Sequence, residues 1–210
     1  KNITKILKDP IKGISAVSKH EIGHRYCPYD TITCIILKHA VKKELEKEKL
    51  PYNIEAASNL IINLFADMCI NTSLIKKGDE DIAWAYQQMS KDRKENLWKV
   101  YGKSMEMAWK KKILPENAEL DENMGASAQQ IANLFEKDFF DKAKWKDNIK
   151  KYAKIISRFL DNENKDKQAS LDDIAGNMPQ QLDEKTEKEL AKRLVEIGSN
   201  GLPTNTNGLK

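Results

Sequence analysis

Residues 54–75 read IEAASNLIINLFADMCINTSLI, a run that is long enough for a helix and apolar on nearly every side. A helix of this kind is predicted to lie in the middle of a domain, because a surface helix would keep one broad polar face. Its polar residues recur at i, i+4 spacing: Glu55, Asn59, Asn63, Asp67 and Asn71. This spacing places them in one row on one side of the helix, where buried polar groups need partners. We therefore expect a second helix to cross this polar row.

The pentad His20-Glu21-Ile22-Gly23-His24 supplies the best partner for that row. In a helix, residues four apart lie on the same face, so both imidazoles can bind one cation. Glu21 points about 100° away from His20 and is left to accept a proton from a metal-bound water. Two imidazoles on zinc with a neighbouring carboxylate as general base are typical of zinc hydrolases. The chain has only three histidines, and two of them fall at this spacing.

A zinc site of this kind needs a third protein ligand, and four residues qualify. Asp67 is preferred, because a carboxylate in a buried helix is the group that most needs a cation. Asp30 lies six residues after His24, and Cys27 lies three residues after it and would supply a thiolate. Glu55 belongs to the same polar row as Asp67. Asp30, Glu55 and Cys27 remain alternatives on the sequence alone.

The two stretches together resemble a metallopeptidase-like domain of prokaryotic proteins that often carry a von Willebrand A-like domain behind it. In that family the first helix contains H-E-x-x-H and the second contains A-D-x-x-I-N, matched here by Ala66-Asp67 and Ile70-Asn71. The resemblance covers about residues 14 to 75. It implies a zincin-like fold of the gluzincin sort, with Asp67 in place of the usual glutamate ligand. The expected function is a zinc-dependent metallopeptidase-like hydrolase in which zinc and Glu21 activate water.

Helical periodicity extends along most of the chain, and no segment shows a strand pattern. We expect a mainly α fold, with a zincin-like helical core, little or no sheet, and additional amphipathic helices. The predicted parts are a metal-binding core over 1–78, a helical part packed on it over 79–161, and short helices with a flexible tail or linker over 162–210. The helices are expected at about 10–26, 31–49, 54–75, 79–89, 91–112, 126–135, 138–161 and 184–197.

Single residues predict further details of these helices and of the site. Gly13 and Gly23 weaken the first helix intrinsically, so tertiary packing must hold it. Gly78 is predicted to occupy the C′ position that ends the central helix. His39, Tyr26 and Tyr86 are candidates for stabilising an oxyanion, although ordinary packing is the better interpretation of each. The four tryptophans are interpreted as core residues.

Composition bounds the location and the partners. The chain is 32% charged with a net charge of +4, and no basic stripe or nucleic-acid motif accompanies that charge, so we expect no nucleic-acid partner. Three cysteines without a C-x-x-C pair favour a reducing compartment. No uninterrupted apolar run reaches the length of a membrane span. We expect a cytoplasmic protein with no membrane association. It is expected to act on a polypeptide substrate or to bind a protein partner, and a further domain can follow the tail.

The alternative function is a non-enzymatic, zinc-stabilised helical interaction module.

Overall fold

The protein folds as a helical bundle in the part that its computed structural model describes, residues 10–24, 31–48, 53–136, 139 and 141–160. Within these ranges all regular structure is helical and no strand occurs, which confirms the mainly α prediction. The elements are α1 (Pro10–Gly23), α2 (Thr31–Lys47), α3 (Ile54–Lys76), α4 (Glu80–Met89), the 3-10 helix η2 (Ser90–Asp92), α5 (Asn96–Trp109), α6 (Glu122–Glu136), α7 (Lys142–Ile156) and the 3-10 helix η3 (Ser157–Phe159).

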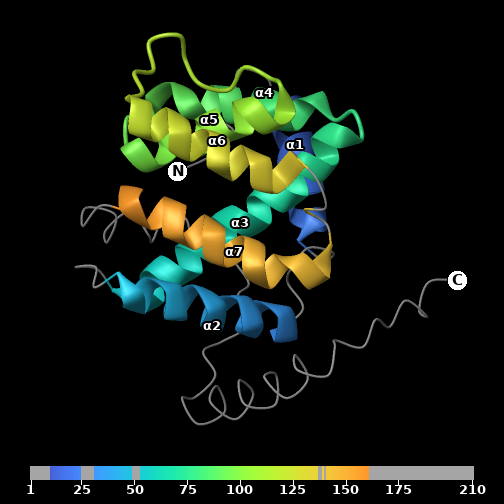
Figure 1. The fold of residues 1–210 in the computed structure, drawn as a ribbon. Helices are drawn as coiled ribbons and strands as arrows, with labels where there is room; N and C mark the ends of the chain where they lie inside the picture. Colours follow the sequence, from blue (N-terminus) through green and yellow to red (C-terminus); the bar gives the residue numbers. More distant parts are fainter. Residues whose placement is uncertain (1–9, 25–30, 49–52, 137–138, 140, 161–210) are drawn as a thin grey trace, which may run out of the picture.

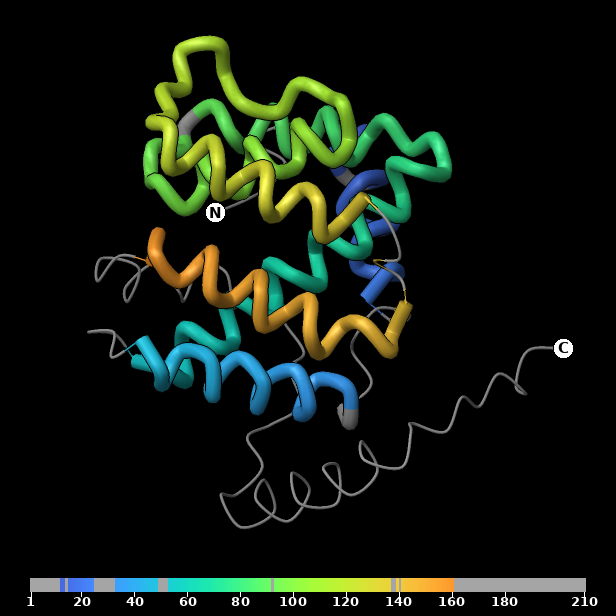
Figure 2. The backbone as a smooth tube through the Cα atoms, viewed as in Figure 1, coloured from blue at the N-terminus to red at the C-terminus, as the bar shows by residue number. Residues whose placement is uncertain are grey.

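Helix α3 crosses the centre of the bundle, as its apolar sequence predicts (Figure 1). Helices α2 and α7 lie side by side on one side of it, and α5 and α6 form a pair on the other. Helix α1 packs against α4 and α3, whereas α2, the next helix in the sequence, packs against α7 and α3 (Figure 2). The side chains of Ile61, Phe65 and Met68 are almost completely buried. By length and composition α3 would also suit a membrane span, but 67% of its most apolar 18-residue stretch is buried inside the protein.

The ends of α3 follow from local chemistry. The side chain of Asn53 accepts hydrogen bonds from the backbone N–H groups of Glu55 and Ala56, which have no partner inside the helix. At the other end Gly78 has φ +90 and donates its N–H to the Ile75 carbonyl at 2.9 Å. Glycine adopts this left-handed conformation without a steric penalty, so the C′ prediction is confirmed.

Several predicted helix bounds were wrong. The helix expected over 91–112 is interrupted, because Arg93 and Glu95 have extended backbone angles between η2 and α5. No proline or glycine marks this break, and the guanidinium of Arg93 instead stacks 4.5 Å from the centre of the Trp98 ring. Helix α6 begins four residues before its predicted start, because the Asp121 carboxylate caps the N–H of Met124 at 2.8 Å. Helix α7 is shorter than the span 138–161 and ends in η3.

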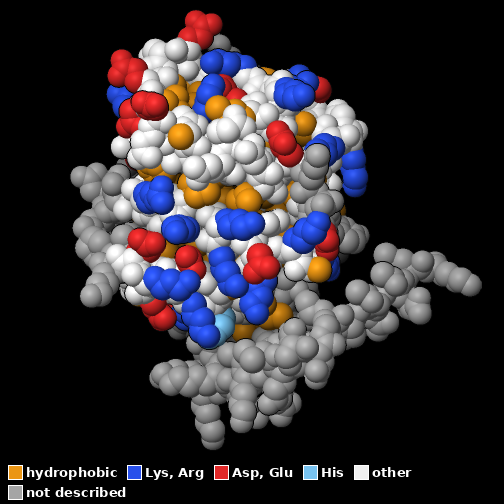
Figure 3. Space-filling view, in the orientation of Figure 1, with side chains coloured by type: hydrophobic (Ala, Val, Ile, Leu, Met, Phe, Trp, Pro, Cys, Tyr) orange, Lys and Arg blue, Asp and Glu red, His pale blue; other side chains and the backbone are white. Residues whose placement is uncertain are grey.

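Helix α7 turns Trp145, Ile149 and Tyr152 into the core. Its lysines lie on the outer face, where Figure 3 shows basic side chains gathered over α7 and α2 with acidic ones between them. Trp145 and Trp109 are buried, and Trp98 and Trp84 pack against the core, so the tryptophans are core residues as expected. The segment 162–210 and the predicted helix at 184–197 lie outside the described residues.

Candidate metal centre

Helix α1 approaches α3 closely at the level of the pentad. A Cβ atom added to Gly23 would lie only 2.4 Å from Cγ2 of Ile70, so glycine is required at this contact. Further back along α1, the ammonium group of Lys19 lies 2.8 Å from a carboxylate oxygen of Asp79 and 3.3 Å from one of Asp81. The close approach at Gly23 and the ion pairs of Lys19 together set the position of α1 against the body of the protein.

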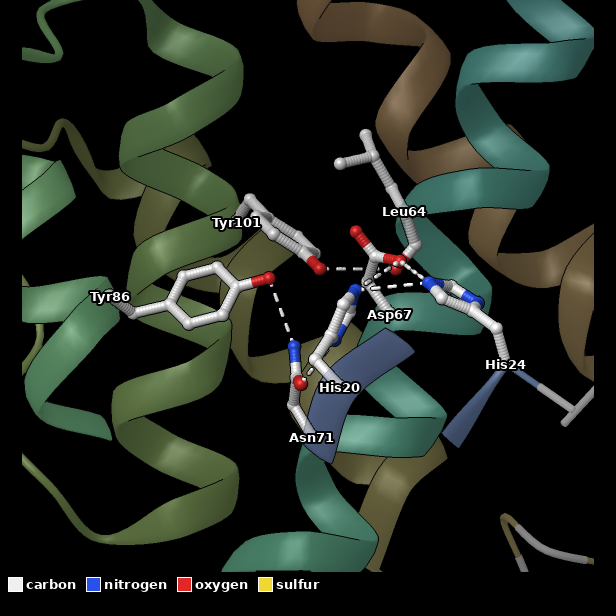
Figure 4. A network of polar contacts seen from close by, with 7 residues as sticks. All are labelled: His20, His24, Leu64, Asp67, Asn71, Tyr86 and Tyr101. Atoms are coloured by element: carbon white, nitrogen blue, oxygen red, sulfur yellow. Dashed lines mark hydrogen bonds and ion pairs between the residues drawn. The ribbon is translucent and has the colours of Figure 1, made fainter. Parts of the chain in front are cut away.

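The pentad and the polar row meet as the spacing predicted (Figure 4). His20 Nε2 and His24 Nε2 lie 3.0 Å apart, and each lies 3.5 Å from Asp67 Oδ1. Helix α1 ends at Gly23, and the predicted end at about Tyr26 lies outside the described residues. The N–H of His24 nevertheless bonds to the His20 carbonyl at 3.2 Å, which keeps the two imidazoles in helical register.

These separations suit a bound metal ion. A tetrahedral zinc ion with bonds of about 2.0 to 2.2 Å holds its ligand atoms about 3.3 to 3.6 Å apart. The two distances to Asp67 Oδ1 lie in this range, and the 3.0 Å between the imidazole nitrogens is a few tenths of an ångström shorter. The donor set of two imidazole nitrogens and one carboxylate oxygen is one that zinc accepts. Asp67 Oδ1 is buried and has no hydrogen-bond partner among the described residues, which is costly for a carboxylate unless a cation binds it. His20, His24 and Asp67 therefore fit zinc both in geometry and in chemistry.

The protonation of the three groups reflects their burial. Burial raises the pKa of Asp67 to about 6, with His20 lowering it and the negative charge of Glu21 raising it further. Burial also lowers the pKa of His24 to about 4, and the neighbouring His20 adds to this effect. At neutral pH His24 is therefore uncharged and Asp67 is ionised. Both states are those that a metal ligand needs.

A second layer of polar residues holds His20. Its Nδ1 lies 2.8 Å from Asn71 Oδ1, and Asn71 Nδ2 donates to the Tyr86 hydroxyl at 2.9 Å. Next to them the Tyr101 hydroxyl donates to the Leu64 carbonyl at 3.1 Å. Sequence reasoning placed Asn71 in the polar row without assigning it a partner. The signal was its position one helical turn beyond Asp67. Tyr86 contacts the site through Asn71.

The structure places Glu55, one of the alternative third ligands, away from Asp67. Glu55 forms ion pairs with Lys38 and Lys42 of α2 and lies 12 residues before Asp67, about 18 Å along the helix axis. It is therefore not part of the cluster, and a third-ligand role for Glu55 is wrong. Asp30, Cys27 and Tyr26 lie outside the described residues.

Glu21 and His39, two further candidates from the sequence, do not belong to the three-residue cluster. Glu21 is exposed on α1, and its negative charge helps to raise the pKa of Asp67, but it is not one of the three clustered residues. His39 lies on α2, where burial and then Lys43 lower its pKa, and it is not one of the clustered residues.

Comparison with known proteins adds no relative. No family model matches the chain, and searches of curated proteins and of solved structures found no match. The geometry of the site is therefore the basis for a functional proposal.

Proposed function

We propose that the protein is a zinc-dependent hydrolase, and more specifically a metallopeptidase. The observation that carries this proposal is the convergence of His20 Nε2, His24 Nε2 and Asp67 Oδ1 within 3.0 to 3.5 Å of one another. The pentad adds an exposed carboxylate, Glu21, directly beside the first of these ligands. The resemblance of the pentad and of Ala66-Asp67 to the metallopeptidase-like family supports the same function.

The residues divide the work in a simple way. His20, His24 and Asp67 would hold the metal from one side, two from α1 and one from α3. Zinc bound there supplies a water with a pKa of about 7 and an electrophile for a carbonyl oxygen. Glu21 would orient the nucleophilic water through its carboxylate and take up its proton. Because Glu21 is exposed, a substrate can reach it from solvent.

The test compares Glu21→Gln with Glu48→Gln, a control that removes an exposed carboxylate just after the end of α2. Each protein, purified without a His tag, is assayed for zinc content and for hydrolysis of a peptide library. We expect one zinc per chain in all three proteins. Peptide hydrolysis should fall by at least about 100-fold in Glu21→Gln and remain unchanged in Glu48→Gln, because only Glu21 acts as general base. A wild-type protein that binds zinc but cleaves no peptide would refute the peptidase function.

A second candidate function follows from where the ligands sit. The site joins α1 to α3, and α1 otherwise rests on α4 through contacts such as Lys19 with Asp79. A zinc ion there would fasten α1 to the bundle without catalysing a reaction, as in structural sites. In that case chelation would lower the thermal midpoint, and Glu21→Gln would change neither stability nor any measured activity.

A further inference from the structure

Behind His20, Asn71 and Tyr86 form a row of polar groups, and the Tyr101 hydroxyl lies next to them (Figure 4). The Leu64 carbonyl can only accept, and it receives the Tyr101 hydroxyl proton at 3.1 Å. A hydroxyl has one proton, so Tyr101 has none left to donate to Tyr86.

The hydrogen bonds that lead to the metal centre are those of Asn71. Its Nδ2 donates to the Tyr86 oxygen at 2.9 Å. The amide is thereby oriented with Oδ1, which can only accept, towards His20 Nδ1 at 2.8 Å. His20 Nδ1 must then carry the imidazole proton, since a neutral imidazole has one. The lone pair is on Nε2, the atom that faces His24 and Asp67.

We propose that Asn71 and Tyr86 are positioning residues that hold His20 in the tautomer with its proton on Nδ1. The opposite tautomer would direct an N–H from Nε2 into the space between His24 and Asp67 and would prevent His20 from binding a metal. Asn71 is fully buried and His20 is 9% exposed, so water has little access to the hydrogen bond between them. The role of these residues rests on the proposed metal site, but the tautomer itself does not require metal to be bound.

The direct test is a spectrum of the metal-free protein labelled with ¹⁵N-histidine. At about pH 8, where an ordinary imidazole is neutral, long-range ¹H–¹⁵N correlation distinguishes a protonated Nδ1 from a protonated Nε2. Only three histidines need to be assigned. We expect wild-type His20 to show the Nδ1–H form alone. In Tyr86→Phe the amide of Asn71 loses the acceptor that orients it, so His20 should show both tautomers.

Metal affinity is the second measurement. Loss of an outer hydrogen bond to a histidine ligand typically costs 10- to 100-fold in affinity. We expect a loss of about this size in Tyr86→Phe and Asn71→Leu, measured by competition with a chelator for zinc. Asn71→Asp keeps an acceptor towards His20 and can accept from Tyr86 on its other oxygen. It should therefore retain the Nδ1–H tautomer and at least wild-type zinc affinity.

Tyr152→Phe is the matched control. Tyr152 is also fully buried, but its hydroxyl has no hydrogen-bond partner in the described part of the chain. Its removal should leave both the tautomer and the zinc affinity unchanged. The proposal is overturned if wild-type His20 carries its proton on Nε2, or if Tyr86→Phe and Tyr152→Phe have the same tautomer and the same affinity. Absence of peptide hydrolysis would refute only the proposed reaction, because neither measurement depends on activity.

Discussion

Gly23→Ala should weaken metal binding although it adds a single methyl group outside the ligand set. The new Cβ would lie 2.4 Å from Cγ2 of Ile70, a branch on a buried residue of the central helix. Carbon atoms in comfortable contact are about 3.5 to 4.0 Å apart. Helix α1 must therefore move away from α3 by about 1 Å. Because His20 and His24 lie on α1, the same movement separates them from Asp67.

The size of the effect follows from the tolerance of a metal site. Ligand distances must stay within about 0.2 Å of their ideal values, so a displacement of about 1 Å should lower zinc affinity at least tenfold, about 1.4 kcal/mol. The effect on folding should be smaller. Overpacking costs about 1 to 3 kcal/mol, and the gain from replacing glycine by alanine in a helix offsets up to about 1 kcal/mol of that.

The assay pairs zinc affinity, measured by competition with a chelator, with urea unfolding of the metal-free protein. Ile70→Leu provides the rescue, because leucine has no branch at Cβ and nearly the same volume. The double variant should recover most of the zinc affinity that Gly23→Ala loses. Wild-type affinity in Gly23→Ala, or no recovery in the double variant, would show that the contact between Gly23 and Ile70 does not position the ligands.

Two further predictions concern charges. In the metal-free protein the pKa of His24 is lowered to about 4, so below pH 6.5 the unfolded chain gains a proton that the folded chain does not, and stability falls between pH 6.5 and 4. The raised pKa of Asp67 opposes this loss, because between about pH 6 and 3.8 the folded chain is protonated first. Urea unfolding should therefore show that Asp67→Asn loses on the order of 2 kcal/mol more stability than wild type over this pH range, after allowance for solvent screening. An equal dependence of stability on pH in the two proteins would contradict the effect of burial on the pKa of Asp67. Glu55→Gln should leave zinc affinity within about twofold of wild type and cost less than about 1 kcal/mol of stability, since Glu55 pairs with Lys38 and Lys42; a tenfold loss of affinity would return it to the metal site.

Part of the site was predictable because it depends on helical periodicity. The i, i+4 spacing puts His20 above His24, and the same spacing puts Asp67 and Asn71 on one side of a buried helix. The need of a buried carboxylate for a partner then pointed to the face that bears the histidines. The convergence of His20, His24 and Asp67 agrees with this reasoning.

Other features had no local signal. The break between η2 and α5 falls among residues with ordinary helix propensity, where the packing of Arg93 on Trp98 accompanies the extended backbone. Gly23 weakens a helix by the usual scale, and that scale does not reveal a contact with Ile70. Tyr86 reaches Asn71 from a helix 15 residues further along the chain.

The sequence by itself determined the helical class of the protein, the central place of α3, the C′ role of Gly78 and the pairing of two imidazoles. These properties depend on residues within a few turns of one another. The tertiary structure alone decided that Asp67 and not Glu55 lies beside His20 and His24, and that Asn71 and Tyr86 support His20. Which parts of two helices meet depends on how closely they approach and where they cross, and that is set by side chains far apart in the sequence.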